Sequence, residues 1–248
     1  MSGVVAGRMP VDGIDAYYES IGTGDPVVFL HGGFCSLEYH RPQLVALAAR
    51  GFAVHAPERP GHGRTADRAG EMSYDLGVAD TLAVMDALGL ARAHVAGFSD
   101  GAVIGMMLAI RHPERVRSLV AISGNRNPAG YVEAEEEGGE DPVTRQLEHD
   151  YSSLSPDGPD HAAVIWEKLI RLWTTSPDIA LAELAGITAP ALFLAGDRDV
   201  IRTEHTVEMS QTVPGAQLGI VPGTGHMLMS ERTELVVTLL GEFLASIR

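Results

Sequence analysis

Short, nearly continuous apolar runs alternate along this chain with segments whose apolar residues recur at helical spacing. Such runs are typical of strands buried on both faces of a parallel sheet, and the helical segments supply the crossovers that parallel strands need. We therefore predict an α/β fold, with helices on both faces of a mostly parallel sheet. The runs that predict parallel strands are residues 27–30, 52–56, 94–98, 116–122, 190–195 and 217–221.

The segments between these runs predict the remaining elements. Residues 4–20 indicate an opening hairpin, because two short strand patterns flank a turn at Asp12-Gly13. Helices are indicated where apolar residues recur three and four positions apart. They are residues 42–50, 74–88, 102–111, 204–212 and 231–247.

The alternation is interrupted over residues 123–188. Residues 133–141 are an acidic run, 152–159 are loop-like, and helical spacing returns at 164–173 and 179–184. Ligands of open α/β folds bind outside the carboxyl ends of the strands. We therefore predict a cap, or lid, inserted over that edge of the sheet.

This cap divides a predicted core that consists of residues 1–122 and 189–248. The cap, residues 123–188, contains both tryptophans of the chain. Trp166 and Trp173 lie seven positions apart and so share one face of a helix. The pair has two interpretations: the rings line a substrate pocket, or they attach the cap to the core.

The charge balance restricts the partners of the chain. There are 33 acidic residues against 18 basic ones, which gives a formal net charge of −15, and Lys168 is the one lysine. Binding to a phosphate backbone needs a dense basic face, so we predict no nucleic-acid partner. The expected partner is a small-molecule substrate, and the sequence leaves a homo-oligomer open.

The sequence also indicates a compartment. Cys35 is the one cysteine, which excludes an intramolecular disulfide and fits a reducing cytoplasm. Residues 1–10 lack the apolar stretch of a signal peptide, and no apolar run is long enough to span a membrane. We expect a cytoplasmic protein without a membrane partner.

A glycine-flanked serine connects a predicted strand to a predicted helix. Ser99 lies between Gly97 and Gly101, and small residues at these positions let strand and helix pass closely while the serine projects from a strained turn. The helix would direct its first N–H groups at whatever lies beside Ser99. Ordinary βα loops also contain this pattern, so a nucleophile requires a base, an acid and a second anion-binding loop elsewhere.

Candidates for the acid and the base follow two later strands. Asp199 comes after a buried run and His226 after the last predicted strand, so both are expected at the same sheet edge as Ser99. Serine is a weak nucleophile until a neutral imidazole takes its proton, and a carboxylate fixes the tautomer of that imidazole. Asp197, two residues from Asp199, is a rival for the carboxylate.

No motif indicates a metal or a cofactor. The glycine-rich segment 58–65, with the following Ala66, contains Gly-x-Gly-x-x-Ala, but the pattern follows a proline and opens no helix, which disfavours a dinucleotide site. The remaining histidines lack the spacing of metal ligands. They are His40, His55, His94, His112, His149, His161 and His205.

Five motifs occur in order along the chain: Leu30-His31-Gly32-Gly33, Arg59-Pro60-Gly61-His62-Gly63-Arg64-Thr65, Gly97-Phe98-Ser99-Asp100-Gly101, Gly196-Asp197-Arg198-Asp199 and Gly225-His226. In this order they resemble the α/β-hydrolase family over nearly the whole chain. The resemblance implies an α/β-hydrolase fold, an eight-stranded, mostly parallel sheet with a cap after strand six.

The resemblance also implies a role for each matching residue. Ser99 would be the nucleophile, His226 the base, and Asp199 the acid that orients the base. The oxyanion hole would use the backbone N–H groups of Gly33 and Asp100.

The side chain of Asp100 has two interpretations. The tripeptide Ser99-Asp100-Gly101, at the turn between the predicted strand and helix, resembles the same stretch in the valacyclovir-hydrolase branch of the family. In that branch the aspartate binds the amino group of the substrate. Alternatively, the carboxylate complements the positive end of its own helix. Phe34, which is the alternative oxyanion donor, and Trp166 and Trp173 are further candidates for substrate contacts.

We therefore predict a cofactor-independent serine hydrolase that cleaves an ester of a small molecule through an acyl-enzyme at Ser99. A lactone or an amide, in place of the ester, is the alternative substrate for the same acyl-enzyme chemistry. The same triad also serves C–C bond hydrolysis and peracid formation, as in haloperoxidase-like enzymes. A non-enzymatic small-molecule receptor on a hydrolase scaffold is the alternative outside catalysis.

Overall fold

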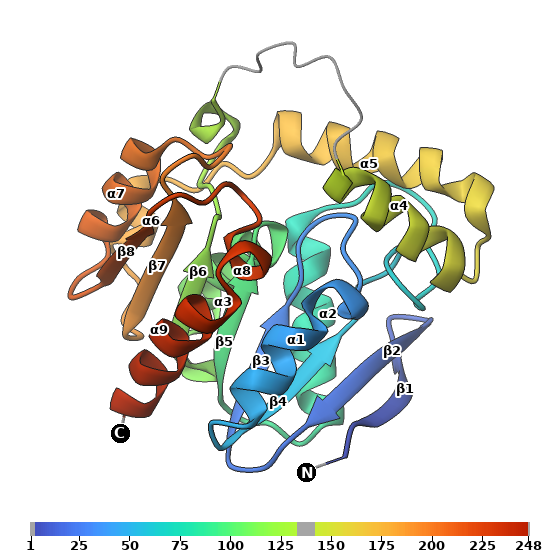
Figure 1. Cartoon of the computed structure of the whole chain (residues 1–248), viewed down its shortest axis with the longest axis horizontal. Coiled ribbons are helices and arrows are strands. Elements are labelled where there is room, and N and C mark those ends of the chain that lie inside the picture. Colours follow the sequence, from blue (N-terminus) through green and yellow to red (C-terminus); the bar gives the residue numbers. More distant parts are fainter. Residues whose placement is uncertain (1–2, 133–141, 248) are drawn as a thin grey trace.

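The computed structural model describes residues 3–132 and 142–247, so the acidic run at 133–141 lies outside the described residues. Eight strands form one sheet in the order β1-β2-β4-β3-β5-β6-β7-β8 (Figure 1). β2 pairs antiparallel with β1 and with β4, and all other neighbours are parallel, which confirms the predicted fold class. The strands are β1 Val5–Val11, β2 Ile14–Ile21, β3 Asp25–Leu30, β4 Phe52–Pro57, β5 Ala93–Phe98, β6 Val116–Ile122, β7 Ala191–Gly196 and β8 Gln217–Val221.

Helices cover both faces of this sheet. α1 and α9 pack together on the near face in Figure 1, and α2 and α3 pack together on the far face. β5 and β7 are buried at every residue, as expected for strands between two helical layers. The helices are α1 Leu37–Ala48, α2 Tyr74–Ala87, α3 Asp100–Arg111, α4 Pro142–Leu154, α5 Ala162–Thr175, α6 Leu181–Leu184, α7 Thr203–Thr212, α8 Leu228–Glu231 and α9 Thr233–Ser246.

The first helix begins earlier than its sequence signal. The helix predicted over 42–50 is α1, which begins at Leu37 and contains Pro42. Glu58 explains the earlier start, because its buried carboxylate accepts the N–H of Leu37 at 3.0 Å and so satisfies a donor of the first turn. A contact between distant segments thus extends the helix beyond its local proline signal.

Two helices were not predicted from the sequence. The helix predicted over 231–247 is α9, Thr233–Ser246, whereas the short helix before it, α8 Leu228–Glu231, was not expected. α4 was not predicted, and its end lies in the stretch expected to be a loop, 152–159. α4 buries Leu147 and Tyr151, four positions apart, so its sequence does carry an apolar stripe at helical spacing that could have predicted it.

Between β6 and β7 the chain leaves the sheet and forms α4, α5 and α6. α4 and α5 lie together above one end of the sheet (Figure 1). On α5, Lys168 Nζ donates to Asp67 Oδ2 at 2.6 Å and to the carbonyl of Arg68 at 2.8 Å. His161 Nε2 lies 2.9 Å from the same oxygen of Asp67. These contacts attach α5 to the loop that follows β4.

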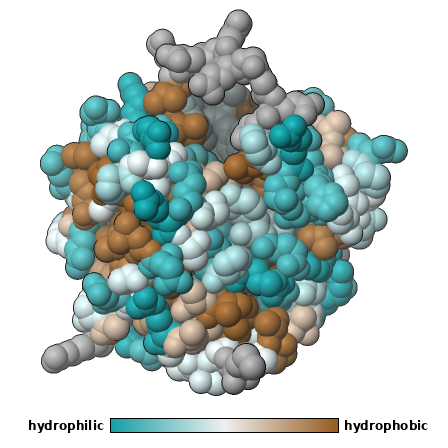
Figure 2. All heavy atoms as spheres, in the orientation of Figure 1, coloured by the Kyte–Doolittle hydropathy of each residue, from teal (hydrophilic) through white to brown (hydrophobic). Residues whose placement is uncertain are grey.

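The surface mixes polar and apolar side chains. On the face shown in Figure 2, apolar residues lie in several separate patches among polar ones. Exposed apolar side chains on such a surface are usual in globular proteins. Among the described residues, no helix is long and apolar enough to cross a membrane.

Four buried histidines make the fold sensitive to acid. His31, His40, His62 and His94 are each at most 1% exposed. Burial is the main cause that lowers their pKa values, to about 3 for His40 and His62, to about 4 for His94, and well below 6.5 for His31. The folded protein therefore keeps these imidazoles neutral at a pH where the unfolded chain protonates them.

We expect the free energy of unfolding to fall as pH decreases below about 6. Because the folded pKa values are depressed, the unfolded state binds more protons in this range, and each histidine costs about 1.4 kcal/mol per pH unit. His40 packs against the rings of Phe29 and Phe98, so His40→Phe should keep the packing and remove one titrating group. Urea unfolding between pH 7.5 and 5 should show a shallower decline for the variant. An equal decline in the free energy of unfolding for wild type and variant would contradict the assignment of part of this pH dependence to His40.

Candidate active site

Ser99 lies at a sharp turn between β5 and α3. Its backbone has φ 53° and ψ −117°, a conformation that L-residues seldom adopt. A Cβ atom on Gly97 would lie 2.1 Å from the carbonyl oxygen of Gly101, and one on Gly101 would lie 2.0 Å from that of Leu30. Both glycines are therefore required by the close approach of strand and helix, as the sequence pattern predicts.

Three of the predicted site residues meet at the carboxyl ends of β5, β7 and β8. The Oγ atom of Ser99 lies 3.0 Å from Nε2 of His226. Nδ1 of His226 lies 2.7 Å from Oδ1 of Asp199. Since the carboxylate accepts the Nδ1–H of the ring, Nε2 is left to accept the serine proton.

The carboxylate of Asp199 is held from several sides. Its side chain is fully buried, and it accepts the hydroxyl proton of Ser123 and the backbone N–H of Ile201, the latter at 3.0 Å. Burial alone would raise the pKa of this carboxyl group, but its hydrogen bonds, first that with His226 and then those with Ser123 and Ile201, lower it below its usual value. Asp199 is therefore an ionised acceptor at neutral pH.

Ser123 is a residue that the sequence analysis missed. It follows β6, has a φ of 52°, and is buried against Asp199. The signal that could have found it is its place at a strand end on the same edge as Ser99. Ser123 limits the orientations that the Asp199 carboxylate can take.

Asp197 has a different set of partners. Its Oδ1 accepts the N–H groups of Gly223 and Thr224 at 2.8 and 3.1 Å, and the first of these bonds is the main cause that lowers its pKa. These two residues lie in the turn that leads to His226. Asp197 thus supports the turn, while Asp199 contacts the imidazole.

The loop after β3 carries Gly33 and Phe34, and each of them contacts a tryptophan of α5. A Cβ atom on Gly33 would lie 2.5 Å from Cζ2 of Trp173 and 2.8 Å from Oδ2 of Asp100. Phe34 is buried and stacks on Trp166, with ring centroids 4.3 Å apart. Both tryptophans of α5 therefore contact this loop of the core.

The side chain of Asp100 is enclosed by three donors. Oδ1 accepts the hydroxyl of Tyr74 at 2.9 Å and Nε1–H of Trp173 at 2.8 Å, and Oδ2 lies 3.4 Å from Nη2 of Arg59. The residue is 2% exposed. Burial, followed by the charge of Asp100, raises the pKa of Tyr74 well above 10, so the phenol remains a donor.

A cleft adjoins this cluster. It lies between the loop after β4, α2 and α5 and holds roughly 420 Å³ of atom-free space, part of it open to solvent. Arg59 borders the cleft and also contacts Asp100. Its other lining residues include His62, Arg68, Met72 and Leu172. The cleft therefore has both polar and apolar walls.

Within residues 3–132 and 142–247, no group of three or more His, Cys, Asp or Glu side chains could hold a metal ion.

The doubly covered, mostly parallel sheet is that of an α/β hydrolase. Residues 27–239 match the alpha/beta hydrolase family. The chain belongs to this family and is an enzyme, a hydrolase.

Similar proteins carry several different activity names. A protein of Azorhizobium caulinodans named as a carbamate hydrolase, RutD, is 40% identical over 118 residues, which are 48% of this chain and 44% of that protein. A protein of Mycobacterium tuberculosis named as a non-heme bromoperoxidase, BpoC, is 30% identical over 95% of this chain and 99% of its own length. The solved structure of Est816, described as an N-acyl homoserine lactone degrading enzyme, is 25% identical, covers 95% of this chain and 99% of that one, and has a TM-score of 0.79.

Proposed function

We propose that the chain is a cofactor-independent serine hydrolase that cleaves an ester of a small molecule. The observation that carries the proposal is the chain of contacts from Ser99 Oγ through His226 to Asp199, at 3.0 and 2.7 Å. An imidazole whose Nδ1–H is fixed by a carboxylate has its Nε2 lone pair directed at the serine hydroxyl. This is the requirement for activating serine at neutral pH.

The reaction would proceed in two steps. Nε2 of His226 takes the proton of Ser99 as Oγ attacks the ester carbonyl, and the imidazolium then gives that proton to the leaving alcohol. Water, deprotonated by the same imidazole, then attacks the acyl carbon, and the imidazolium returns that proton to Ser99 Oγ as the bond between Oγ and the acyl carbon breaks and the acid leaves. Asp199 stays ionised throughout and stabilises the imidazolium.

The negative oxygen of the tetrahedral intermediate needs hydrogen-bond donors. We assign the backbone N–H groups of Gly33 and Asp100 to this role. They flank Ser99 from the loop after β3 and from the first residue of α3. One such donor is typically worth about 10²–10³-fold in kcat.

Residues 123–188 would form the cap of this site. In support, α5 places Trp166 on Phe34 and Trp173 against Gly33, so the segment covers the loop that carries a proposed oxyanion donor. A small-molecule substrate would bind between this cap and the carboxyl ends of the strands.

The proposal is tested by covalent labelling. A fluorophosphonate probe should react with the wild-type protein at Ser99, and intact-mass and peptide mass spectrometry should locate the adduct. Heat-denatured protein is the control, because an unactivated serine does not react. No labelling of the folded protein would overturn the proposed function and favour a receptor on a hydrolase scaffold.

Peracid formation is a second candidate function. The relative named as a bromoperoxidase is 30% identical to this chain over nearly its whole length, which supports this activity as a candidate. Hydrogen peroxide would replace water as the nucleophile that releases the acyl group, giving a peracid and free Ser99. Bromination of monochlorodimedone in acetate buffer with peroxide and bromide should then depend on Ser99, and its absence would reject this candidate.

A further inference from the structure

The Asp100 carboxylate is already occupied by groups of the protein. Tyr74 of α2, Trp173 of α5 and Arg59 of the loop after β4 all direct donors at it. An ionised carboxylate offers about four acceptor positions, and a buried one needs hydrogen-bond donors. Three donors take three of those positions, and at 2% exposure the carboxylate has little surface left for the amino group of a substrate.

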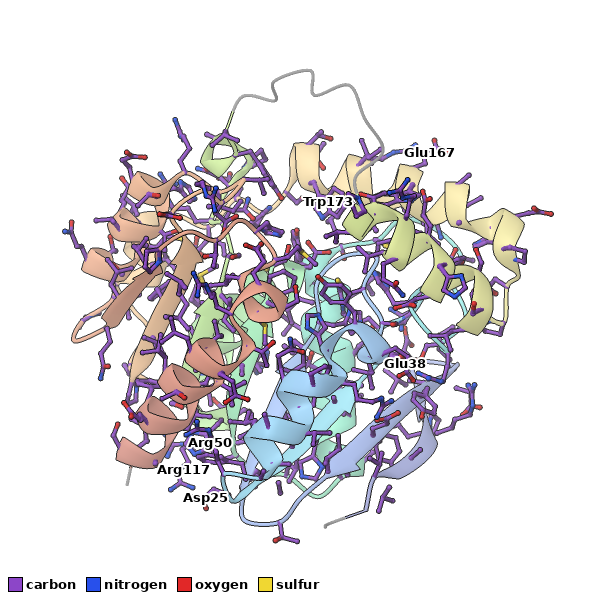
Figure 3. All side chains as sticks on the ribbon, viewed as in Figure 1. Asp25, Glu38, Arg50, Arg117, Glu167 and Trp173 are labelled. Carbon is purple, nitrogen blue, oxygen red and sulfur yellow. The ribbon has the colours of Figure 1, made fainter. Side chains whose placement is uncertain are left out.

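Trp173 connects this carboxylate to the loop after β3, which carries Gly33. In Figure 3 Trp173 lies on the side of α5 that faces the sheet, whereas Glu167 lies on its outer side. The indole ring packs against Gly33, where a Cβ atom would meet Cζ2 at 2.5 Å. The ring therefore touches one proposed oxyanion donor while its Nε1–H bonds the side chain of the residue that supplies the other.

We infer that the Asp100 side chain is a positioning group for the oxyanion hole. By holding the indole of Trp173 it docks α5 against the Gly33 turn, and it fixes the relative placement of the N–H groups of Gly33 and Asp100. The oxyanion hole is complete when α5 is docked. The substrate is then not recognised through a cationic group bound by the Asp100 carboxylate. This inference rests on the proposed function.

The negative charge of Asp100 is part of this arrangement. The guanidinium of Arg59 faces Oδ2, and both side chains are largely withdrawn from water, with 12% and 2% of their areas exposed. A buried carboxylate requires such a partner, since an unpaired charge at this depth is costly. An apolar residue at position 100 would leave Arg59, Tyr74 and Trp173 without their acceptor.

The first test removes the hydrogen bond between Trp173 and Asp100 while α5 keeps its other contacts with the rest of the protein. Trp173→Phe keeps an aromatic ring and removes the indole N–H, so we expect kcat for a short p-nitrophenyl ester to fall by about 10- to 100-fold, with KM within about threefold of wild type. Inhibition by a trifluoromethyl ketone, which mimics the tetrahedral intermediate, should weaken by the same factor as kcat.

Arg171→Gln is the matched control on the same helix. Arg171 pairs with Glu71 and Glu167 at the surface and is 53% exposed, so its loss should change kcat by less than about twofold. An unchanged kcat in Trp173→Phe would overturn the inference, and so would an equal loss in both variants.

The second test does not depend on activity. The chain has two tryptophans, so its NMR spectrum should contain two indole N–H signals, and Trp173→Phe assigns one of them. Exchange of the Trp173 proton with solvent should accelerate by at least about 10-fold in Asp100→Ala while the Trp166 signal is retained.

The two tests distinguish the possible failures. Slow exchange that depends on Asp100, in a protein that the fluorophosphonate does not label, would leave the contact intact and reject the proposed function. Labelling at Ser99 together with exchange that is indifferent to Asp100→Ala would reject this inference alone. If Asp100→Ala does not fold, the kinetics of Trp173→Phe still decide the question.

Discussion

Ser99→Ala is expected to abolish ester hydrolysis while the fold persists. The hydroxyl makes the one contact between the serine side chain and His226, so its removal leaves no nucleophile within reach of an ester carbonyl. Loss of a serine nucleophile costs about 10⁴- to 10⁶-fold in kcat in other enzymes with this triad. Hydrolysis of a short p-nitrophenyl ester measures the effect.

His226→Ala should have an effect of similar size, because the two side chains act as one unit and their losses do not add. The double variant should therefore be no slower than either single one. Circular dichroism and thermal melts of all three proteins are the controls for folding. Full activity in either single variant would exclude the acyl-enzyme mechanism.

Asp199→Asn is expected to lower kcat by roughly 10⁴-fold, the loss known for the equivalent change in a serine protease. An asparagine amide can present N–H₂ to Nδ1 of His226, which selects the tautomer with a protonated Nε2. That tautomer cannot take the proton of Ser99. KM should change little, since Asp199 is buried and does not face the substrate.

Asp197→Asn is the matched control, two residues away. The asparagine oxygen can still accept the N–H groups of Gly223 and Thr224, so kcat should fall by less than about 10-fold. The kinetics of both variants on one ester give the comparison. If Asp197→Asn proves the more damaging change, the assignment of the acid is wrong.

The sequence predicted the sheet because its strands are buried on both faces. β5 and β7 consist of short, nearly apolar runs whose pattern has one common interpretation. The turn at Ser99 was predictable for a similar reason, since Gly97 and Gly101 leave no room for a side chain. The predictions of β5, β7 and the turn at Ser99, each of which rests on a local pattern with one physical cause, were confirmed.

The surroundings of Asp100 could not be predicted in this way. Its partners Arg59, Tyr74 and Trp173 come from three segments up to 73 positions away, and nothing local marks them as donors to one carboxylate. Ser123 is a similar case, 76 positions from Asp199. Such contacts depend on tertiary packing, as does the start of α1 at Leu37.

Lys168 has a practical consequence for studying this enzyme. It is the one lysine side chain of the molecule, and its ammonium group bonds Asp67 and Arg68 when α5 is in place. Acylation of that amine by an activated ester requires the group to leave these partners. The rate of acylation at this single position, followed by peptide mass mapping, therefore reports how often the Lys168 side chain leaves Asp67 and Arg68.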